Sequence, residues 1–177
     1  MTIRTRPATE ADHQVAGAIC VAAYLESGQI HDQRGYAEEL ADVAARARDA
    51  EVIVAEDPDT GEILGNVTLV LAGQQLAEIA LPGEAEFRML AVAPSAQRRG
   101  VGSALVRACL DRASALGCTA MAIYTRDFND AAIRMYEGFG FVRTPDLDWT
   151  PLAGLRLVAM RVELPARAGQ PSPGPAT

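Results

Sequence analysis

A loop with two glycines and two arginines carries the clearest chemical signal in this sequence. Its residues run in the order Gln97, Arg98, Arg99, Gly100, Val101, Gly102 and Ser103. Glycine lets a backbone approach a ligand closely and adopt dihedral angles that other residues avoid. An apolar helical pattern follows, and the first N–H groups of a helix lack internal partners and lie at the positive end of its dipole. The segment therefore predicts a binding site for a phosphate or pyrophosphate group.

Two common phosphate-binding loops do not fit these residues. A Walker A loop needs a lysine after its second glycine, and no lysine follows either glycine here. A dinucleotide-binding fingerprint needs a third glycine, at the position that Leu105 occupies. On these residues alone, glycines that serve only to turn the chain remain an alternative.

The elements around the loop explain how it would be positioned. A strand-like run over residues 85–92 precedes it, and residues 103–116 form a helical pattern with a wide apolar face. Gly117 is typical of a helix end, and the apolar run 119–125 reads as the next strand. A strand, a helix and a strand at this spacing predict a right-handed parallel crossover.

The remaining chain predicts one α/β domain over residues 1–164. Before the loop we expect a strand at 3–6, helices at 9–26 and 35–50, and a hairpin of strands 51–56 and 63–71. Thr9 and Asp12 fit a capping pair at the first of these helices. After the crossover we expect a helix at 129–137, strands at 140–143 and 155–164, and an irregular loop at 145–154. The Pro- and Gly-rich segment 165–177 is predicted to be disordered.

Composition narrows the function classes. The chain has 177 residues and a net charge of −7, which argues against non-specific nucleic-acid binding and against an anionic membrane surface. No signal peptide or transmembrane run is visible, and Cys20, Cys109 and Cys118 lack metal-type spacing, so we expect a cytoplasmic protein with reduced thiols. Because His13 and His31 are the only histidines, no metal site is expected.

Three motifs in one order resemble the GNAT superfamily of acyl-CoA-dependent N-acetyltransferases. Gln97–Gly102 fits the family's Gln/Arg-x-x-Gly-x-Gly/Ala loop, Asn129–Tyr136 fits its Asn-x-x-Ala-x-x-x-Tyr helix, and Gly138–Phe141 fits the phrase that follows. The resemblance runs from Ile3 to about Leu164. It implies a mixed, curved sheet of about six to seven strands, flanked by about four helices and splayed between its central strands.

The resemblance also implies where acetyl-CoA, the expected co-substrate, would bind. The backbone N–H groups from Arg98 to Ser103 would hold its pyrophosphate, with charge-assisted contacts from the two arginines. Its pantetheine arm would lie along the backbone of Leu90, Ala91 and Val92. Asn129 would bond that arm or an ordered water, and it also fits a plain helix N-cap.

The resemblance suggests two catalytic side chains. Tyr136 would donate a proton to the departing sulfur, and the Leu90 N–H would stabilise the oxyanion. Glu86 lies eleven residues before Gln97, a place that resembles the base glutamate of the branch that acetylates histone tails. A solvated glutamate at a strand edge is the alternative for Glu86, and Glu84 is a second choice for the base.

The amine acceptor is the least determined part of the prediction. In this fold it would meet the first helix pair and the loop before the last strand, where the acidic and aromatic residues suit a cationic or polar amine of a small molecule or peptide. These residues are Tyr24, Glu26, Gln29, His31, Asp32, Tyr36, Asp146, Asp148 and Trp149. An inactive acyl-CoA sensor and a different acyl donor remain alternatives, and the oligomeric state stays open, with a homodimer among the options.

Overall fold

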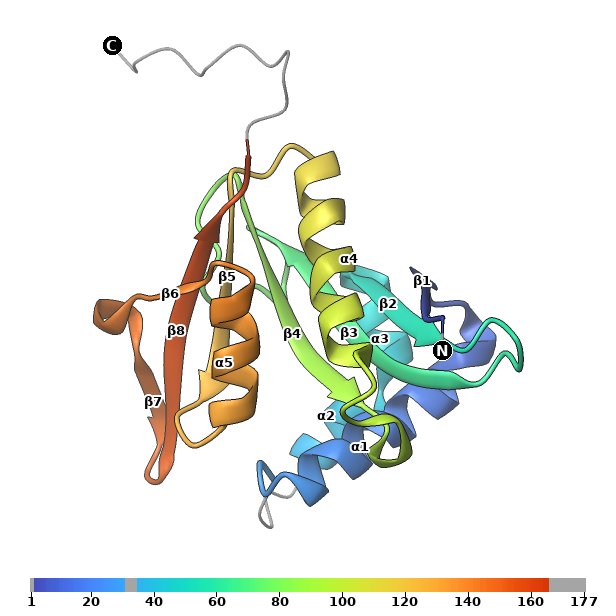
Figure 1. Cartoon of the computed structure of the whole chain (residues 1–177). Coiled ribbons are helices and arrows are strands. Elements are labelled where there is room, and N and C mark those ends of the chain that lie inside the picture. The colour runs from blue at the N-terminus through green and yellow to red at the C-terminus, as the bar shows by residue number, and fades with distance from the viewer. Residues whose placement is uncertain (1, 31–34, 166–177) are drawn as a thin grey trace.

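The computed structural model describes residues 2–30 and 35–165, which form eight strands in one sheet and five α-helices around it (Figure 1). The strands are β1 (Arg4–Pro7), β2 (Glu51–Glu56), β3 (Ile63–Leu71), β4 (Glu84–Val92), β5 (Ala120–Arg126), β6 (Val142–Arg143), β7 (Trp149–Leu152) and β8 (Leu155–Glu163). The helices are α1 (His13–Glu26), α2 (Tyr36–Ala41), α3 (Val43–Asp49), α4 (Val101–Ala115) and α5 (Asp130–Gly138). Short 3-10 turns occupy Glu10–Asp12, Pro94–Ala96 and Pro145–Leu147.

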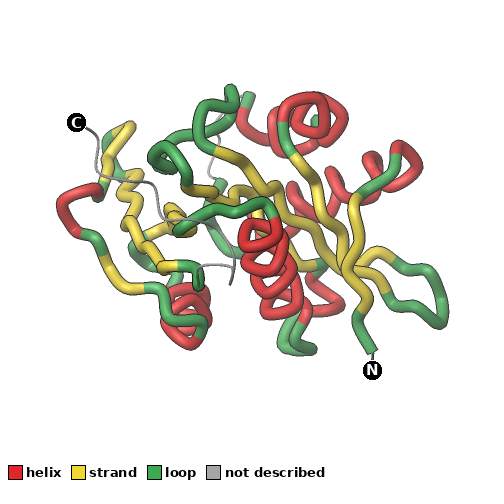
Figure 2. The backbone as a smooth tube through the Cα atoms, turned by 90° about the horizontal axis from the view of Figure 1, so that it is seen from above, coloured by secondary structure: helices red, strands yellow, loops and turns green. Residues whose placement is uncertain are grey.

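The sheet is mixed, and helices cover both of its faces (Figure 2). Its strand order is β1-β2-β3-β4-β5-β8-β6, with β7 paired to β8, and only the β4–β5 pair is parallel. Neighbouring residues of β3 show which helix lies on each face of the sheet, because successive side chains of a strand point to opposite sides. A Cβ at Gly65 would meet α4, whereas Asn66 donates to the Ala16 carbonyl of α1.

The predicted crossover and its apolar helix are confirmed. β4 and β5 run parallel on either side of α4, which buries one stripe of side chains against the sheet. That stripe consists of Val101, Leu105, Val106, Cys109 and Ala113. The helix therefore sits rigidly on the sheet, and its N-terminal end is fixed beside the end of β4.

Two parts of the prediction differ from the structure. The single helix expected at 35–50 is divided at Asp42, whose side chain accepts from the Ala45 N–H at 2.8 Å and caps α3. Asp favours such caps because its carboxylate competes for backbone N–H groups within a helix. The loop expected at 145–154 contains β7, which forms a hairpin with β8 and raises the strand count to eight.

The predicted capping pair lies in a network of charges near the N-terminus. Asp12 accepts from the Thr9 N–H at 2.7 Å and from the Arg6 guanidinium at 2.7 and 3.0 Å. Arg6 also donates to Glu56 of β2 at 2.7 Å. The hydrogen bond from Arg6 lowers the pKa of Asp12 well below its usual range, although burial acts in the opposite direction. This network fastens β1 to the turn that begins α1.

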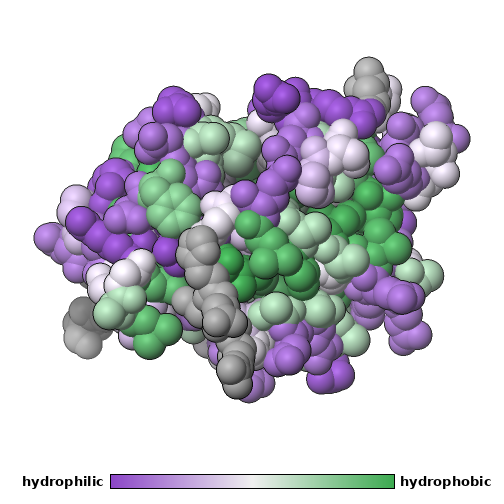
Figure 3. All heavy atoms as spheres, turned by 90° about the horizontal axis from the view of Figure 1, so that it is seen from below, coloured by the Kyte–Doolittle hydropathy of each residue, from purple (hydrophilic) through white to green (hydrophobic). Residues whose placement is uncertain are grey.

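The surface of the described chain gives two further observations. Within residues 2–30 and 35–165, no helix is long and apolar enough to cross a membrane. The face seen from below carries apolar side chains across its middle and polar side chains around its rim (Figure 3).

Candidate active site

The glycine loop leads into α4 through two left-handed residues. Arg98 has a φ of 59° and Gly100, the N-cap of α4, has a φ of 85°. The first hydrogen bond within the helix runs from the Ala104 N–H to the Gly100 carbonyl at 3.0 Å. The N–H groups of the preceding first turn are therefore left for an external acceptor, as the phosphate prediction requires.

The side chains of this loop have different surroundings. Gln97 donates to the Glu26 carboxylate at 2.7 Å and so ties the loop to the end of α1, while Arg98 and Arg99 are exposed. A Cβ added to Gly102 would lie 3.3 Å from the Met135 sulfur and 3.7 Å from Val92. The second glycine thus lets α4, α5 and β4 approach one another at the loop.

The central strands separate where the sequence predicted a splay. β4 and β5 pair only at Glu84–Ala120, Ala85–Met121 and Glu86–Ala122. Beyond Glu86 the two strands diverge, as Figure 1 shows. The remaining residues of β4, including Leu90 and Val92, have no partner on β5 among the described pairs. Their side of the strand is free to accept an extended ligand as an additional strand.

A bulge in β4 sets the direction of its backbone groups. The β3–β4 register shifts between Asn66 and Thr68, opposite Met89, which has a φ of 52°. After the bulge, the Ala93 N–H donates to the Leu64 carbonyl on β3 at 2.8 Å. Backbone N–H groups alternate between the two edges of a strand, so those of Val92 and Leu90 face the gap toward β5.

The predicted helix motif lies beside this gap. Tyr136 and Asn129 line a hollow of about 50 Å³ together with Leu90 and Thr125. Asn129 caps α5, since its side chain accepts from the Ala132 N–H at 3.3 Å, which leaves its NH₂ group for another contact. The structure therefore brings together, around one hollow, Tyr136 and Leu90, which were predicted to act at the thioester, and Asn129, which was predicted to bond the pantetheine arm or a water.

Tyr136 is held in an aromatic cluster. Its ring centroid lies 5.6 Å from that of Phe87 and 5.9 Å from that of Phe141. Burial raises the pKa of the Tyr136 hydroxyl far above its ordinary value. The phenol therefore stays protonated near neutral pH, which suits a proton donor and excludes a base.

Glu86 is buried, and its carboxylate is occupied by backbone donors. The N–H groups of Glu78, Ile79 and Ala80 donate to it at distances between 2.7 and 3.0 Å. These bonds hold the loop between β3 and β4 over the sheet. Glu86 lines the cavity where a base would be needed, but three donors compete for the lone pairs that would take up a proton. The second choice, Glu84, is paired with Arg161 at 2.7 Å.

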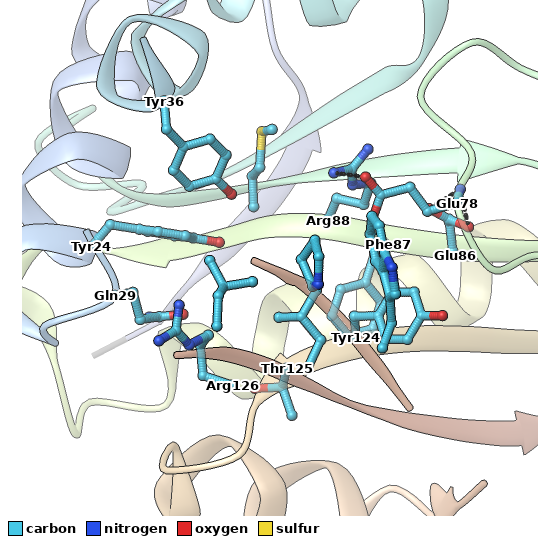
Figure 4. Close-up of a pocket in the computed structure, with 15 residues that line it drawn as sticks. Tyr24, Gln29, Tyr36, Glu78, Glu86, Phe87, Arg88, Tyr124, Thr125 and Arg126 are labelled. Carbon is cyan, nitrogen blue, oxygen red and sulfur yellow. Dashed lines mark hydrogen bonds and ion pairs between the residues drawn. The ribbon is translucent and has the colours of Figure 1, made fainter. Parts of the chain in front are cut away.

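A larger cavity of about 230 Å³ adjoins the hollow (Figure 4). Seven residues line both, among them Tyr24, Gln29 and Thr125. Of the acceptor-side residues named from the sequence, Tyr24, Gln29, Tyr36 and Trp149 line the larger cavity. It therefore opens onto the gap between the strands through the lining residues that it shares with the hollow.

The other acceptor-side predictions lie elsewhere. Asp148 is fixed by the Ala159 N–H at 2.9 Å and by Arg143 at 2.8 Å. Burial raises its pKa, but these bonds outweigh burial and lower the pKa overall. Asp146 is exposed, Glu26 is bonded to Gln97, and His31 and Asp32 lie outside the described residues.

Sequence reasoning missed several cavity residues, among them Glu78, Arg88, Tyr124 and Arg126. Arg88 pairs with Glu78 at 2.7 Å and donates to the Leu76 carbonyl at 2.7 Å. The sequence contained a spacing that could have revealed three of these residues, because Arg88 is two residues from Glu86, and Tyr124 is two residues from Arg126. The period of two places each pair on one face of its strand.

Known proteins share both the sequence pattern and the fold. An aminoglycoside N(6')-acetyltransferase type 1 of Klebsiella aerogenes is 40% identical over 96 residues, which cover 54% of this chain and 61% of that enzyme. A mycothiol acetyltransferase of Sanguibacter keddieii is 36% identical over 83 residues, which cover 47% of this chain and 26% of that enzyme. The chain thus spans less than two thirds of these relatives.

The fold comparison covers almost the whole chain. The structure of Salmonella typhimurium YncA, solved with its cofactor acetyl-CoA, superposes with a TM-score of 0.70 at 24% identity, over 97% of this chain and 99% of the other. The model of the acetyltransferase (GNAT) family matches residues 18–141, which include the glycine loop, the gap and the Asn129–Tyr136 helix. The chain therefore belongs to the GNAT family of acetyltransferases.

Proposed function

We propose that this protein transfers an acetyl group from acetyl-CoA to an amine by direct attack in a ternary complex. The observation that carries the proposal is the continuity of three features: the open N-terminal turn of α4, the unpaired edge of β4, and a cavity behind that edge. The hollow and the cavity share lining residues, so two substrates could meet at the gap from opposite sides.

The residues present fit acetyl-CoA. The N–H groups between Arg98 and Ser103 would hold the pyrophosphate, since the left-handed Gly100 opens the first turn of α4. Leu90 and Val92 would bond the pantetheine arm through their backbones, and Asn129 would contribute its free NH₂ group. When bound there, acetyl-CoA supplies a thioester, whose acetyl carbon is open to attack by nitrogen.

The side chains at the gap suit the proton movements of such a transfer. The reaction forms one nitrogen–carbon bond and breaks one carbon–sulfur bond, and the proton lost by nitrogen balances the proton gained by sulfur. Tyr136 would donate to the sulfur, because burial keeps its hydroxyl protonated. The Leu90 N–H, facing the gap, would stabilise negative charge on the carbonyl oxygen.

The test combines binding with turnover. Isothermal titration should show acetyl-CoA binding that is weakened by Gly102→Val, since even a single Cβ would already meet the Met135 sulfur at 3.3 Å. Hydrolysis-corrected release of CoA thiol with a panel of amines should show acetyl transfer. Binding without transfer to any amine would refute the proposal and indicate an acyl-CoA sensor, and competition with propionyl- and succinyl-CoA would reveal a different donor.

A further inference from the structure

The charges of the larger cavity are unevenly compensated. Among the described residues, four charged side chains line it: Glu78, Glu86, Arg88 and Arg126. Glu78 and Arg88 form an ion pair at 2.7 Å, and Glu86 is satisfied by three backbone N–H groups. The acidic residues are thus already engaged by the protein, so the cavity offers a cationic acceptor less attraction than its composition indicates.

Arg126 is the exception. Among the described residues, no carboxylate lies within ion-pair distance of its guanidinium. Its Nε is buried without a hydrogen-bond partner, and its Nη2 reaches the Gly154 carbonyl only at 3.4 Å, beyond the usual range. The guanidinium lies 4.9 Å from the Phe128 ring centroid, a contact that uses its face and leaves its terminal N–H groups available.

A planar guanidinium without an ion-pair partner is complementary to a carboxylate. Its two terminal nitrogens present parallel N–H groups that can bind both oxygens at once. The Nε is buried by the protein, so a ligand in the cavity would meet the terminal nitrogens and not the Nε. A neutral or cationic group would not supply the missing negative charge.

The position of Arg126 would place a bound carboxylate in the cavity next to the gap. Arg126 ends β5 next to Thr125, which lines both the cavity and the hollow, as does Gln29. Figure 4 shows Arg126 near Gln29 and well away from Glu78 and Glu86. The cavity that Arg126 lines and the hollow at the gap share lining residues, so a carboxylate at Arg126 and an amine in the gap would occupy adjoining spaces.

The rest of the cavity suits a short side chain. Its volume of about 230 Å³ is below the roughly 300–1,000 Å³ typical of drug-sized ligands. Tyr36, Tyr124 and Trp149 supply aromatic walls of the cavity, and Tyr124 and Trp149 lie 6.1 Å apart between ring centroids. An apolar or aromatic group would be held there.

We propose that the acceptor is a small amino carboxylate of the α-amino acid type, whose carboxylate is bound by Arg126 while its amine enters the gap between β4 and β5. This inference rests on the proposed acetyl transfer and narrows its acceptor class. It replaces the expectation of a cationic amine, because none of the described acidic residues on which that expectation rested lines the cavity, and Glu26 and Asp148 are bonded within the protein.

The first test compares acceptors that differ only in the carboxylate. Leucine, methionine and phenylalanine are each assayed beside their carboxamides and beside the amines that lack the carboxyl group, by release of CoA thiol from acetyl-CoA. The carboxamides have the less basic amines, so they would react faster if the carboxylate made no contact. We expect at least one amino acid to exceed both counterparts by tenfold or more in kcat/KM. Equal or better kcat/KM for the counterparts in every set overturns the inference.

The second test uses variants of Arg126. We expect Arg126→Gln to raise the KM of the preferred amino acid by roughly tenfold to a hundredfold, the usual effect of losing a charge-assisted pair. Its KM for acetyl-CoA should stay unchanged, and its preference for carboxylate over carboxamide should vanish. Arg126→Lys, which keeps the charge without the fork, should be intermediate. Arg48→Gln, at an exposed arginine of α3 outside the cavity, is the control and should match the unmodified protein.

A binding measurement separates this inference from the proposed function. If no amine is acetylated, the proposed transfer fails, and titration of the same amino acids in the presence of CoA still tests the site. Binding that disappears in Arg126→Gln supports a carboxylate site, while absence of binding overturns it. Acetylation that is independent of the carboxylate and unaffected by Arg126→Gln leaves the transfer standing and refutes only the acceptor class.

Discussion

Replacing Glu86 by glutamine separates two roles of a buried carboxylate. The sequence predicts that Glu86 is the general base, whereas the structure shows it accepting from the N–H groups of Glu78, Ile79 and Ala80. As a base it would act in the chemical step. As an anchor it would hold the loop whose residue Glu78 lines the larger cavity.

The hydrogen bonds set the size of the expected effect. Ile79 and Ala80 both donate to one oxygen, while Glu78 shares its N–H between the two at 3.0 Å each. Glutamine can keep the shared oxygen, but its bonds lose their charge assistance, about 1 kcal/mol each, and its NH₂ faces an N–H donor at a cost of about 1–3 kcal/mol. We expect a total loss of roughly 3–5 kcal/mol of unfolding free energy, which lowers the Tm by roughly 6–20 °C.

Thermal unfolding and steady-state kinetics should be measured on the same preparations. For an anchor, Glu86→Gln lowers the Tm and raises the KM of the amine, while kcat changes by less than about threefold. Glu84→Gln is the matched control. Glu84 is a buried neighbour on the same strand, it is bonded to Arg161, and it does not line the cavity. Its loss should reduce stability without changing the KM of the amine.

The opposite pattern would refute this reasoning. A Glu86→Gln protein with an unchanged Tm and amine KM, a kcat lowered by tenfold or more, and no acidic limb in its pH–rate profile would identify Glu86 as the base. The loop would then be held by contacts other than the three hydrogen bonds to this carboxylate.

Three other side chains test the site and the fold. Tyr136→Phe keeps the ring in its aromatic cluster but removes the hydroxyl, so kcat should fall by about tenfold or more while calorimetry shows unchanged acetyl-CoA affinity. Gly17→Ala would place a Cβ 2.3 Å from a backbone carbonyl of α2 and should cost about 1–3 kcal/mol in urea denaturation, whereas Gly138→Ala, with no atom within 4 Å, should be neutral or slightly stabilising. Because Arg6 lowers the folded-state pKa of Asp12, that pair stabilises the protein above the unfolded pKa of about 3.9 and loses this effect as the pH falls. Asp12→Asn should therefore be less stable at pH 7, and its deficit should shrink in denaturation curves taken toward pH 3.

Local chemistry explains which elements could be predicted from the sequence. The α4 stripe follows a helical period and the hairpin strands are bounded by turn residues, so each was visible in a short window. The division at Asp42 was missed because a good cap inside an Ala-rich segment looks like an ordinary helical position until its carboxylate is seen bonded to Ala45. β7 was missed because Trp149 and Leu152 become a strand only by pairing with β8.

The sequence by itself was enough to predict a phosphate-binding loop and the helix motif beside it. The predicted roles of Gly100, Gly102 and Tyr136 depend on residue type and on spacing along the chain, and both can be read from the sequence. The structure places Tyr136 and Leu90 around one hollow, while their roles toward acetyl-CoA stay predictions.

Only the tertiary structure decided which charged side chains of the larger cavity already have partners within the protein. Glu86 and Arg126 both read as polar residues in buried strands, and nothing local distinguishes them. The fold brings three backbone donors to Glu86 and leaves Arg126 without a carboxylate among the described residues. The energy of a buried charge depends on partners that are distant in sequence, so the availability of a side chain for a substrate is a property of the folded chain.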